Sequence, residues 1–366
     1  MARIIGHIDL DYFYAQVEEV ENPSIKGRPV VVCVFSGRTE ESGVVSTSNY
    51  RARELGVSSG MPIAIAKKRL QRHDPVVIKM VHEKYEAVSS RIMDIVGQRV
   101  DILERTGIDE AFFDVTSSSN EDFRVAERIA NDIKDAIMQR ERLTSSVGLG
   151  RSKVVAKLAS DAAKPGGLIV VLPNSTEAFL GPLPVSKLYG VGPKTAAALE
   201  EVGIRTVEEL AKADPQDLEL RVGRKFASFL VAAATGTDAE PVSANEGPTQ
   251  LSRIVTLKRD TRDPEEAIAQ IAEGITQIHK KLTASGKSFR TISAIGILTD
   301  LSMKTRSKTF DTPINDAKVI GESARLLIAD LANSSGKDLR RVGVRVSELT
   351  DEEEQSSLSE FLQPTG

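Results

Sequence analysis

The chain has one cysteine among its 366 residues, Cys33, which stands in the apolar segment 30–35. A single cysteine excludes an intramolecular disulfide and a cysteine-ligated zinc site, and it fits a reducing compartment. Cys33 itself is expected to be a small buried hydrophobic residue. The chain also lacks an apolar run near the roughly 18 residues that a membrane span needs, and its N-terminus begins with a strand pattern instead of a signal peptide. We therefore expect a cytoplasmic protein without a membrane partner.

The charge balance argues at first against a nucleic-acid partner, because the formal net charge is -4. That average hides an asymmetry within the C-terminal third. Residues 251–350 hold 17 Lys and Arg against 12 Asp and Glu, whereas residues 351–366 hold five acids and no base. A basic module followed by an acidic tail indicates a polyanionic partner. The length allows about two to four domains of roughly 100–200 residues each.

Two acidic clusters stand at the ends of strand-like apolar segments. Asp9 and Asp11 follow an apolar run near the N-terminus, and Asp109 and Glu110 stand between two strand-like runs. Carboxylates in such settings are costly to bury unless positive charge lies between them, and oxygen ligands suit hard divalent cations. A two-metal carboxylate site would serve in-line attack on phosphorus. The alternative interpretation is that each acid is a solvated strand end or turn residue.

The first 172 residues alternate strand and helix patterns. Apolar runs predict strands at 3–9, 29–35, 101–105, 111–115, 145–150 and 167–172. Helical spacing predicts helices at 15–21, 48–55, 62–70, 82–97, 123–140 and 153–163. This order suggests an antiparallel sheet backed by helices, of the ferredoxin-like kind. In that fold the end of the first strand can lie beside the turn of the central hairpin, which would bring Asp9, Asp109 and Glu110 together.

After residue 172 the pattern changes to short helices. The segment 188–196 is typical of a helix-hairpin-helix turn, in which Gly190 and Gly192 let the backbone approach a phosphate and Lys194 adds charge. A plain tight turn between two helices is the alternative. A weaker second copy stands at 221–225. Beyond it, a stretch rich in Gly, Pro, Ser and acids, 237–248, is expected to be a linker.

The C-terminal module returns to strand patterns at 254–258, 291–298, 305–310 and 341–346, with helices expected at 264–283 and 316–332. Basic side chains alternate along these strands. We expect one sheet face to present a row suited to phosphate contacts, made of Arg253, Arg259, Arg306, Lys308, Arg341 and Arg345. An ordinary half-exposed sheet face that happens to be basic is the alternative. Few aromatic residues are interleaved here, which argues against stacking on unpaired bases.

Five sequence blocks, in order, resemble the Y family of DNA polymerases, and most closely its archaeal DinB (polymerase IV) branch of translesion enzymes. The segments 9–18 (DLDYFYAQVE) and 107–111 (GIDEA) look like the two signature motifs of that family. Three further segments are similar to other family blocks: 43–53, 147–150 and 163–166. The resemblance covers residues 1–350. Any one motif would be weak evidence, but all of them together in family order are specific.

The resemblance implies an α+β multidomain fold. Its parts would be a ferredoxin-like palm at 1–11 and 80–172, fingers at 12–79, a helical helix-hairpin-helix thumb at 173–236, a linker at 237–248, a C-terminal α/β little-finger domain at 249–350 that binds DNA, and an acidic tail at 351–366.

The resemblance also implies roles for individual residues. Asp9, Asp109 and Glu110 match the catalytic carboxylates, which would bind two Mg²⁺ ions together with the backbone carbonyl of Leu10. Tyr14 matches the aromatic steric gate that rejects a 2′-hydroxyl, whereas a core aromatic is the alternative for this residue taken alone. Contacts with the incoming triphosphate are implied for five residues with hydroxyls or cations: Tyr12, Thr47, Tyr50, Arg53 and Lys164. Lys157 is either a further phosphate contact or a solvated surface lysine.

The implied function is template-directed DNA synthesis of the lesion-bypass type, in which dNTPs are added to a primer 3′-hydroxyl by two-metal nucleotidyl transfer. Low fidelity is implied. No proofreading exonuclease is expected, because the domains named above account for all the residues of the chain. The expected partners are primer-template DNA, dNTPs and a sliding clamp, and the protein is expected to be a monomer. The tail fits a clamp-binding pattern through Gln355, Leu358, Phe361 and Leu362, although Leu362 stands where an aromatic residue is usual. A chance match is the alternative.

Two departures from the family pattern concern the geometry around metal and phosphate. Gly107 stands where the family usually has serine, and Arg151-Ser152-Lys153 replaces a more common asparagine–lysine pattern. Val44 and Ser46 lie in the segment that roofs the nascent base pair in the family, and such small residues would leave the pocket open to lesions.

Two functions of other classes are the alternatives. A nucleotidyl cyclase would share the sheet and the metal chemistry, but the thumb-like turn and the basic module argue against it. A non-catalytic scaffold that binds clamp and DNA would not need the intact acidic residues.

Overall fold

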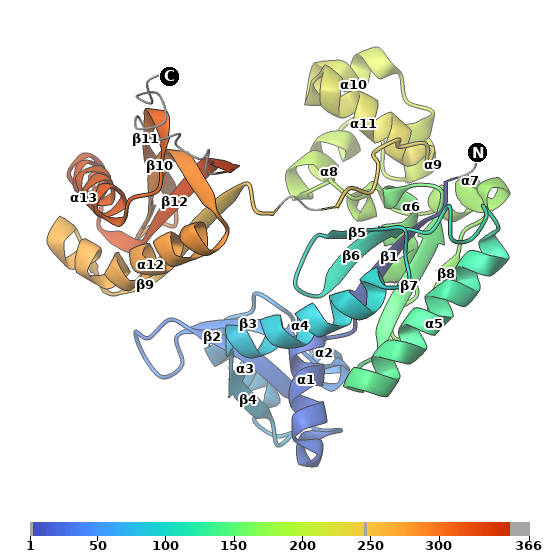
Figure 1. Ribbon diagram of the computed structural model, residues 1–366, viewed down its shortest axis with the longest axis horizontal. Coiled ribbons are helices and arrows are strands. Elements are labelled where there is room, and N and C mark those ends of the chain that lie inside the picture. The colour runs from blue at the N-terminus through green and yellow to red at the C-terminus, as the bar shows by residue number, and fades with distance from the viewer. Residues whose placement is uncertain (1–2, 245–246, 352–366) are drawn as a thin grey trace, which may run out of the picture. The chain divides into compact units, whose positions relative to one another are not determined.

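The computed structural model describes residues 3–244 and 247–351. They form two compact units, traced in Figure 1. The first unit is built from 3–34 and 44–244, and the second from 35–43 and 247–351. Within the described residues, no helix has the length and apolar character that crossing a membrane requires.

Strand β1 is the centre of a five-stranded sheet in the first unit, with the order β5-β6-β1-β7-β8 (Figure 1). The strands are β1 (Ile5–Leu10), β5 (Ile102–Arg105), β6 (Glu110–Asp114), β7 (Ser145–Gly150) and β8 (Leu168–Val170). β1 pairs antiparallel with β6 and with β7, while β7 and β8 at the edge are parallel. Every residue of β1 is buried, because helices cover both faces of the sheet. The expected antiparallel core backed by helices is confirmed.

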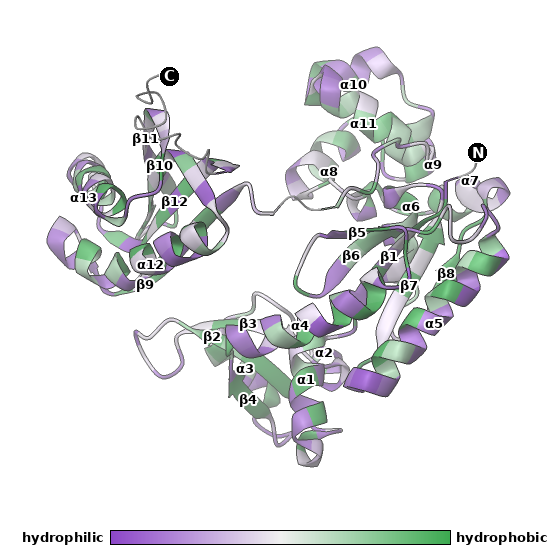
Figure 2. Ribbon diagram, viewed as in Figure 1, coloured by the Kyte–Doolittle hydropathy of each residue, from purple (hydrophilic) through white to green (hydrophobic). Residues whose placement is uncertain are grey.

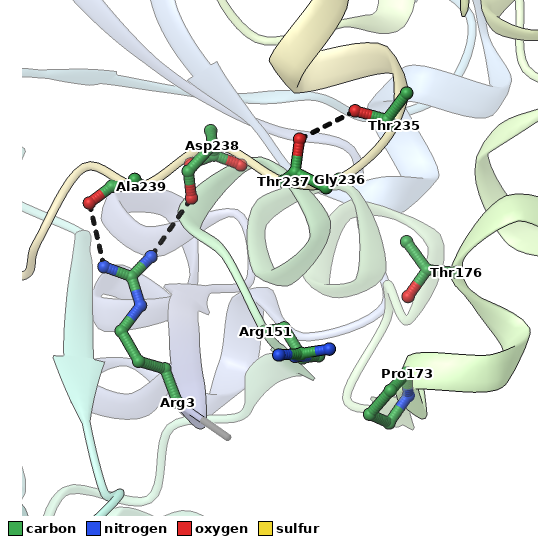
Figure 3. Close-up of a pocket in the computed structure, with 9 residues that line it drawn as sticks. All are labelled: Arg3, Arg151, Pro173, Thr176, Thr235, Gly236, Thr237, Asp238 and Ala239. Carbon is green, nitrogen blue, oxygen red and sulfur yellow. Dashed lines mark hydrogen bonds between the residues drawn. The ribbon is translucent and has the colours of Figure 1, made fainter. Parts of the chain in front are cut away.

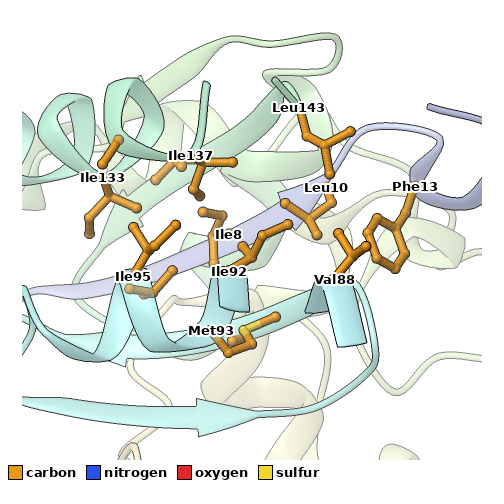
Figure 4. Packing of buried hydrophobic residues seen from close by; sticks show 14 of the residues in the cluster. Ile8, Leu10, Phe13, Val88, Ile92, Met93, Ile95, Ile133, Ile137 and Leu143 are labelled. Carbon is orange, nitrogen blue, oxygen red and sulfur yellow. The ribbon is translucent and has the colours of Figure 1, made fainter. Parts of the chain in front are cut away.

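Each face of this sheet is covered by different helices. One face carries α4 (His82–Gly97) and α5 (Phe123–Glu141). Their buried aliphatic side chains pack against those of β1, as Figure 4 shows for Ile8, Leu10, Ile92, Ile95, Ile133 and Ile137. Figure 2 shows the corresponding hydrophobic and hydrophilic stripes along α5.

The opposite face is covered by α6 (Lys153–Ala162), which crosses β7 at very close range. A Cβ atom on Gly148 would lie 2.1 Å from the carbonyl oxygen of Ala156. Glycine is therefore required at this crossing, and the close approach fixes where the C-terminal half of α6 lies relative to the end of β1.

A three-stranded sheet with the order β3-β2-β4 lies between β1 and α4 in the sequence, and β2 and β4 are parallel. The elements of this region are α1 (Phe13–Glu21), η1 (Pro23–Ile25), β2 (Val30–Phe35), β3 (Gly43–Ser48), α2 (Tyr50–Glu54), α3 (Ile63–Leu70) and β4 (Val76–Lys79).

The sequence pattern missed β3 and β4, and the helix expected at 48–55 was wrong at its start. Asn49 caps that helix, because its side-chain oxygen accepts a hydrogen bond from the Ala52 amide at 2.9 Å. Ser48 therefore ends a strand instead of beginning a helix. Both missed strands are short and depend on pairing with β2, which periodicity along the chain does not report.

The residues after β8 form short helices around a core that they share with one side of α6. They are η2 (Pro173–Ser175), α7 (Thr176–Leu180), η3 (Val185–Lys187), α8 (Pro193–Glu200), α9 (Val207–Ala211), α10 (Pro215–Val222) and α11 (Arg224–Ala234). Their buried leucines include Leu180, Leu199, Leu210, Leu218 and Leu230. The change to short helices after residue 172 is confirmed.

Residues 238–243, in the expected linker, are anchored on the five-stranded sheet. The Arg3 guanidinium donates to the backbone carbonyls of Asp238 at 3.1 Å and Ala239 at 2.9 Å (Figure 3). Val242 is buried against three residues of the sheet and α6: Ile5, Phe112 and Ala156. The free part of the linker is consequently shorter than its composition suggests.

The second unit is a four-stranded antiparallel sheet in the order β11-β10-β12-β9, with two helices on one face. Its elements are β9 (Gln250–Thr261), α12 (Pro264–Ala284), β10 (Lys287–Leu298), β11 (Met303–Ile314), α13 (Ala317–Ser334) and β12 (Leu339–Asp351). The helices and the sheet share a core that includes Leu257, Ile271, Ile278, Ile292, Ile328, Val342 and Val344. Each strand is longer than the segment that the sequence predicted.

The expected row of basic side chains on one face of this sheet is wrong. Arg253 pairs with Val344, Arg306 with Ala294, and Lys308 with Ile292. Because paired residues share a face and these partners belong to the core under the helices, the three cations lie on the helix side of the edge strands.

Arg341 and Arg345 instead alternate with the buried valines of β12 and lie on the open face. Arg259 is bonded to Glu266 of α12 at 2.9 Å, which turns it toward the helices as well. Spacing along one strand could not reveal this division, because the face that a residue shares with a neighbouring strand depends on the register.

Candidate active site

The two acidic clusters lie side by side at one end of the five-stranded sheet. In the β1–β6 register Asp9 stands opposite Glu110, and the Leu10 amide donates to the Asp109 carbonyl at 2.9 Å. Asp9 stands at the end of β1 and Glu110 at the start of β6. Because these two strands are antiparallel neighbours, the two acids meet at the same end of the sheet. The expected proximity of Asp9, Asp109 and Glu110 is therefore confirmed, while their roles stay predictions.

Lysines from α6 and from the loop after it reach these acids. The Lys164 ammonium lies 2.6 Å from Asp9 Oδ2, and the Lys157 ammonium lies 2.7 Å from Glu110 Oε2. Within 3–244 and 247–351, no three Asp, Glu, His or Cys side chains are grouped closely enough to hold a metal ion together. Two of the three acids are paired with ammonium groups instead. Lys157 is thus neither solvated nor free, and it belongs to the site.

The three acids have different proton affinities because their surroundings differ. Burial raises the pKa of Asp9 to about 6, against the opposing effect of Lys164. Burial and the neighbouring Glu110 charge also raise the pKa of Asp109. In contrast, His7 and the Lys157 ammonium lower the pKa of Glu110 to about 2. Two carboxyls with raised pKa values beside one with a lowered pKa form a site with an incomplete supply of positive charge.

Asp9 and Asp109 open onto a cavity of about 310 Å³ whose walls come from several elements. It is lined by Asp9, Leu10, Tyr12, Phe13, Tyr14, Ser46, Thr47, Arg53, Ser59, Asp109 and Lys164. Four of the five expected triphosphate contacts thus surround one space, together with the expected steric gate. Tyr50 and Glu110 do not line it. The Glu110 carboxylate is turned toward His7 and Lys157 instead.

Tyr14 forms one wall of this cavity and is also packed on the core. Its ring centroid lies 4.4 Å from that of Tyr85, which is fully buried. The Tyr85 hydroxyl donates to Glu18 at 2.5 Å, so that ring is held from behind. Burial raises the pKa of Tyr14, which therefore stays a neutral phenol at physiological pH. The two interpretations of Tyr14 are compatible, since packing on one side makes a rigid wall on the other.

Tyr50 and Arg53 of α2 form a small polar cluster beside the cavity. The Arg53 guanidinium lies 5.1 Å from the Tyr50 ring centroid, and its Nε donates to the Ser48 carbonyl at 2.9 Å. The Tyr50 hydroxyl is buried and, among the described residues, has no hydrogen-bond partner. Burial raises the pKa of Tyr50 to about 12. A buried hydroxyl donor without an acceptor is costly, so this group suits an anionic ligand.

Tyr12 is set in an unusual backbone conformation at the start of α1. Its φ of 35° lies in the left-handed region, and its hydroxyl donates to Glu19 at 3.2 Å. The Tyr12 ring packs edge-on against the Tyr50 ring, with centroids 5.0 Å apart. Strained backbone of this kind is retained where the surrounding structure determines it, commonly at functional sites.

His7 belongs to the site, although it was not among the residues expected from the sequence. The ring is fully buried, its Nδ1 lies 2.7 Å from Ser160 Oγ, and its Nε2 lies 3.4 Å from Glu110 Oε2. Burial lowers the pKa of His7, so the imidazole is mainly neutral. The available signal was a polar residue inside an otherwise apolar strand, two positions before Asp9.

The two departures from the family pattern have different consequences. A Cβ atom on Gly107 would lie 3.1 Å from Glu110 Cγ and 3.4 Å from Asp109 Oδ1, so a serine there would press on both acids. Ser152 caps α6 by accepting from the Val155 amide. Lys153 is buried between Glu104 at 2.7 Å and Glu240 at 3.1 Å, and it is therefore committed to structure.

The residues expected to hold DNA are not among those that line this cavity. Gly190 and Gly192 are exposed in the turn that leads into α8, and Lys194 is exposed in the first turn of that helix. Gly190 has the φ of +86° that favours glycine. The weaker copy of the turn joins α10 and α11 at Gly223. Arg341 and Arg345 lie on the open face of the second unit. The residues expected to bind a clamp lie outside the described residues: Gln355, Leu358, Phe361 and Leu362.

Family models match three parts of the chain. The impB/mucB/samB family model matches residues 8–161, and the model of its C-terminal domain matches residues 248–359. The IMS family HHH motif matches residues 173–204, where the helix-hairpin-helix turn was expected.

Known proteins are similar along almost the whole chain. The DNA polymerase IV of Methanosarcina acetivorans is 40% identical over 99% of this chain and 100% of its own length. A Y-family DNA polymerase chimera, Dbh-Dpo4(243-245)-Dbh, superimposes with a TM-score of 0.90 at 34% identity, over 95% of this chain and all of the chimera. An insertion ternary complex of Dbh DNA polymerase gives a TM-score of 0.71 at 34% identity, over 95% of this chain and all of that one. With these matches from end to end, the chain belongs to the Y family of DNA polymerases, in the polymerase IV (DinB) branch.

Proposed function

We propose that this polymerase extends a primer 3′-hydroxyl opposite damaged as well as intact template bases, with low fidelity and without proofreading. The observation that carries the proposal is the meeting of Asp9 and Asp109 at a cavity that is also lined by hydroxyls and cations, with Glu110 opposite Asp9 in the strand register. Such a site can hold a triphosphate against carboxylates without covalent chemistry by the protein. The similar Dbh polymerase is described in an insertion ternary complex and a post-insertion binary complex, which supports DNA and dNTPs as partners here.

Members of this family are metal-dependent nucleotidyltransferases, and we propose two Mg²⁺ ions for this chain. The donor set fits such ions, because Asp9, Asp109 and Glu110 offer hard carboxylate oxygens and burial raises the pKa of the first two. The Leu10 backbone carbonyl is a further candidate ligand. When bound, the metal would supply a lowered pKa for the primer hydroxyl and charge compensation for the leaving pyrophosphate.

The remaining cavity residues have roles that follow from their charge and position. Lys164, Arg53 and the hydroxyls of Tyr12, Thr47 and Tyr50 would neutralise and orient the triphosphate, and the buried Tyr50 hydroxyl would gain the acceptor that it lacks among the described residues. Tyr14, held by Tyr85, would meet the sugar and reject a 2′-hydroxyl by its bulk.

We propose the division into palm, fingers, thumb, linker and little finger at the boundaries given above, with a cytoplasmic monomer as the working form. In the thumb, Gly190, Gly192 and Lys194 would approach the DNA backbone. In the little finger, Arg341 and Arg345 on the open face are the best candidates among the six basic residues. The acidic tail would bind a sliding clamp.

Primer extension on paired templates, one intact and one with a single abasic site, tests this function. We expect template-directed addition on both, dependence on a divalent cation and on an annealed primer, and no shortening of a mismatched primer. Synthesis that stops before the abasic site would contradict the lesion-bypass function. Product formation from nucleotides without a primer would favour a cyclase, which the comparisons with known polymerases do not support.

A further inference from the structure

The loop that carries Lys164 is held on both sides by charged residues from other elements. The Asp11 carboxylate accepts a hydrogen bond from the Gly166 amide at 2.9 Å. The Lys134 ammonium, on α5, donates to the Gly166 carbonyl at 2.7 Å and to the Gly167 carbonyl at 2.9 Å. One residue, Gly166, therefore has its amide bound by an acid and its carbonyl bound by a base.

The acid is fully and the base partly removed from water where these contacts are made. Asp11 is fully buried, and its second carboxylate oxygen accepts from Ser146 Oγ at 2.7 Å. Lys134 is half-buried, and burial is the largest cause of its lowered pKa. Burying a carboxylate and an ammonium group is unfavourable unless each is hydrogen-bonded, so both charges depend on the loop backbone between them.

The loop has few other conformations available to it. Gly166 has a φ of +65°, in the left-handed region. A Cβ atom on Gly167 would lie 2.3 Å from the Ala163 carbonyl oxygen, so the chain turns tightly against the end of α6. The hydrogen bonds from Lys134 and to Asp11 therefore stabilise one orientation of the loop. That orientation directs the Lys164 ammonium to Asp9 and the cavity.

The helix itself does not need Lys134 for its packing. α5 is fixed on the sheet by buried aliphatic residues, among them Ala126, Ala130, Ile133 and Ile137. A lysine at this position of α5 could extend into solvent without loss of helix packing. Lys134 instead donates hydrogen bonds to the carbonyls of Gly166 and Gly167. The contact therefore serves the loop more than the helix.

We propose that Lys134 and Asp11 are positioning residues for nucleotide binding, which clamp Gly166 so that Lys164 faces the triphosphate. Neither residue would touch the nucleotide, and their effect would pass through Lys164. The inference rests on the proposed contact between Lys164 and the triphosphate. Loss of the clamp would let the loop move, and ordering it again would cost part of the affinity for nucleotide.

The test measures dNTP Kd and kcat by single-nucleotide incorporation on the full-length protein, together with its Tm. Lys134→Met keeps most of the stem and removes the charge. We expect it to raise the Kd for dNTP roughly fivefold with kcat and Tm little changed. Lys134→Arg keeps several N–H donors and should restore a Kd within about twofold of the parent. The matched control is Arg128→Met, an exposed cation on the same helix, which should leave Kd unchanged.

A double variant separates this inference from the function on which it rests. If Lys134 acts through Lys164, Lys134→Met should add little to the Kd of Lys164→Met, because the clamp then holds a loop without its cation. A Lys164→Met protein with the parent Kd would overturn the triphosphate contact itself. A raised Kd for Lys164→Met with a parent-like Kd for Lys134→Met would overturn only the positioning role. Full additivity, or a lower Tm of Lys134→Met with unchanged Kd, would also overturn it, since Lys134 would then act independently or only on stability.

Discussion

The ammonium nitrogen of Lys164 lies 2.6 Å from a carboxylate oxygen of Asp9, so a proposed phosphate contact and a proposed metal ligand neutralise each other. Lys157 and Glu110 form a second pair of the same kind. These pairs reduce the repulsion between neighbouring carboxylates in the protein alone. A metal ion could replace the ammonium group as the partner of the carboxylate, and a triphosphate could replace the carboxylate as the partner of the ammonium group. We therefore expect metal and triphosphate to favour each other's binding.

Removal of one acid should abolish synthesis without loss of the fold. Asp109→Ala is expected to reduce single-nucleotide incorporation by roughly 10³-fold or more, because several kcal/mol of charge stabilisation would be lost with the metal. Asp94→Ala is a suitable control, since it removes an exposed acid from α4. Affinity for primer-template DNA, measured by fluorescence anisotropy, should be kept in both. Near-normal incorporation by Asp109→Ala would contradict the metal assignment.

The pKa of Asp9 makes the stability of the metal-free protein depend on pH. Burial raises this pKa from 3.8 to about 6, so between these values the folded state holds a proton that the unfolded chain has released. The resulting stability is fully present below the unfolded pKa and is lost as pH rises through the folded pKa. Asp9→Asn cannot ionise, and its unfolding free energy relative to the parent should rise by up to about 2 kcal/mol between roughly pH 4 and pH 7.

Urea unfolding in the presence of a chelator checks this pH dependence. Asp94→Asn, in which an exposed carboxyl is changed in the same way, should show no such trend. Added Mg²⁺ should then stabilise the parent at neutral pH more than it stabilises Asp9→Asn. A difference between Asp9→Asn and the parent that stays flat across this pH range would mean that Asp9 has an ordinary pKa.

Sugar selection should depend on the bulk of Tyr14. Tyr14→Ala is expected to raise the ratio of kcat/KM for rNTPs over dNTPs by on the order of 10- to 100-fold, because the wall beneath the 2′ position would be removed. Tyr14→Phe keeps that wall on Tyr85 and should keep the discrimination. Steady-state incorporation of matched rNTP and dNTP pairs gives both ratios. An unchanged ratio for Tyr14→Ala would leave Tyr14 with a packing role alone.

The basic residues on the open face of the second unit should contribute most of that unit's affinity for primer-template DNA. Arg341→Ala with Arg345→Ala is expected to weaken primer-template binding and to reduce the salt slope by roughly one to two, because two phosphate contacts would be lost. Arg253→Ala with Arg306→Ala removes the same charge from the helix side, where Gln277 and Asp330 already engage these residues. That pair should change the affinity much less. Equal effects of the two pairs in a salt titration would show that only net charge matters.

Clamp binding should reside in the C-terminal tail. Phe361→Ala, or truncation after Glu354, is expected to abolish binding to a ring-shaped sliding clamp while distributive synthesis continues, since one aromatic anchor supplies much of the apolar burial in so short a peptide. Calorimetry with a peptide of residues 350–366 and the cognate clamp measures this directly. A peptide with Ser359→Ala, which changes no proposed anchor, is the control. A silent titration with the parent peptide at high micromolar concentration would make the motif a coincidence.

The sequence by itself predicted the features that depend on neighbours along the chain. Helix α4 and strand β7 have the bounds that periodicity indicated, and the proximity of Asp9 to Glu110 followed from the order of strands and helices. Side-chain periodicity reports burial directly, because a helix or strand presents the same residues to the core wherever it packs. Strands β3 and β4 escaped detection, since their stability comes from pairing with β2.

Only the tertiary structure decided the partners of the charged groups. In that structure His7 contacts Glu110, and Lys157 forms an ion pair with Glu110. Lys134 donates a hydrogen bond to the loop that carries Lys164. The tertiary structure also divided the basic residues of the second unit between the two faces of one sheet. These relationships join residues far apart in sequence, and they are set by strand register and by the crossing of helices. A one-residue change in register would reverse the faces, while the composition of each strand would stay the same.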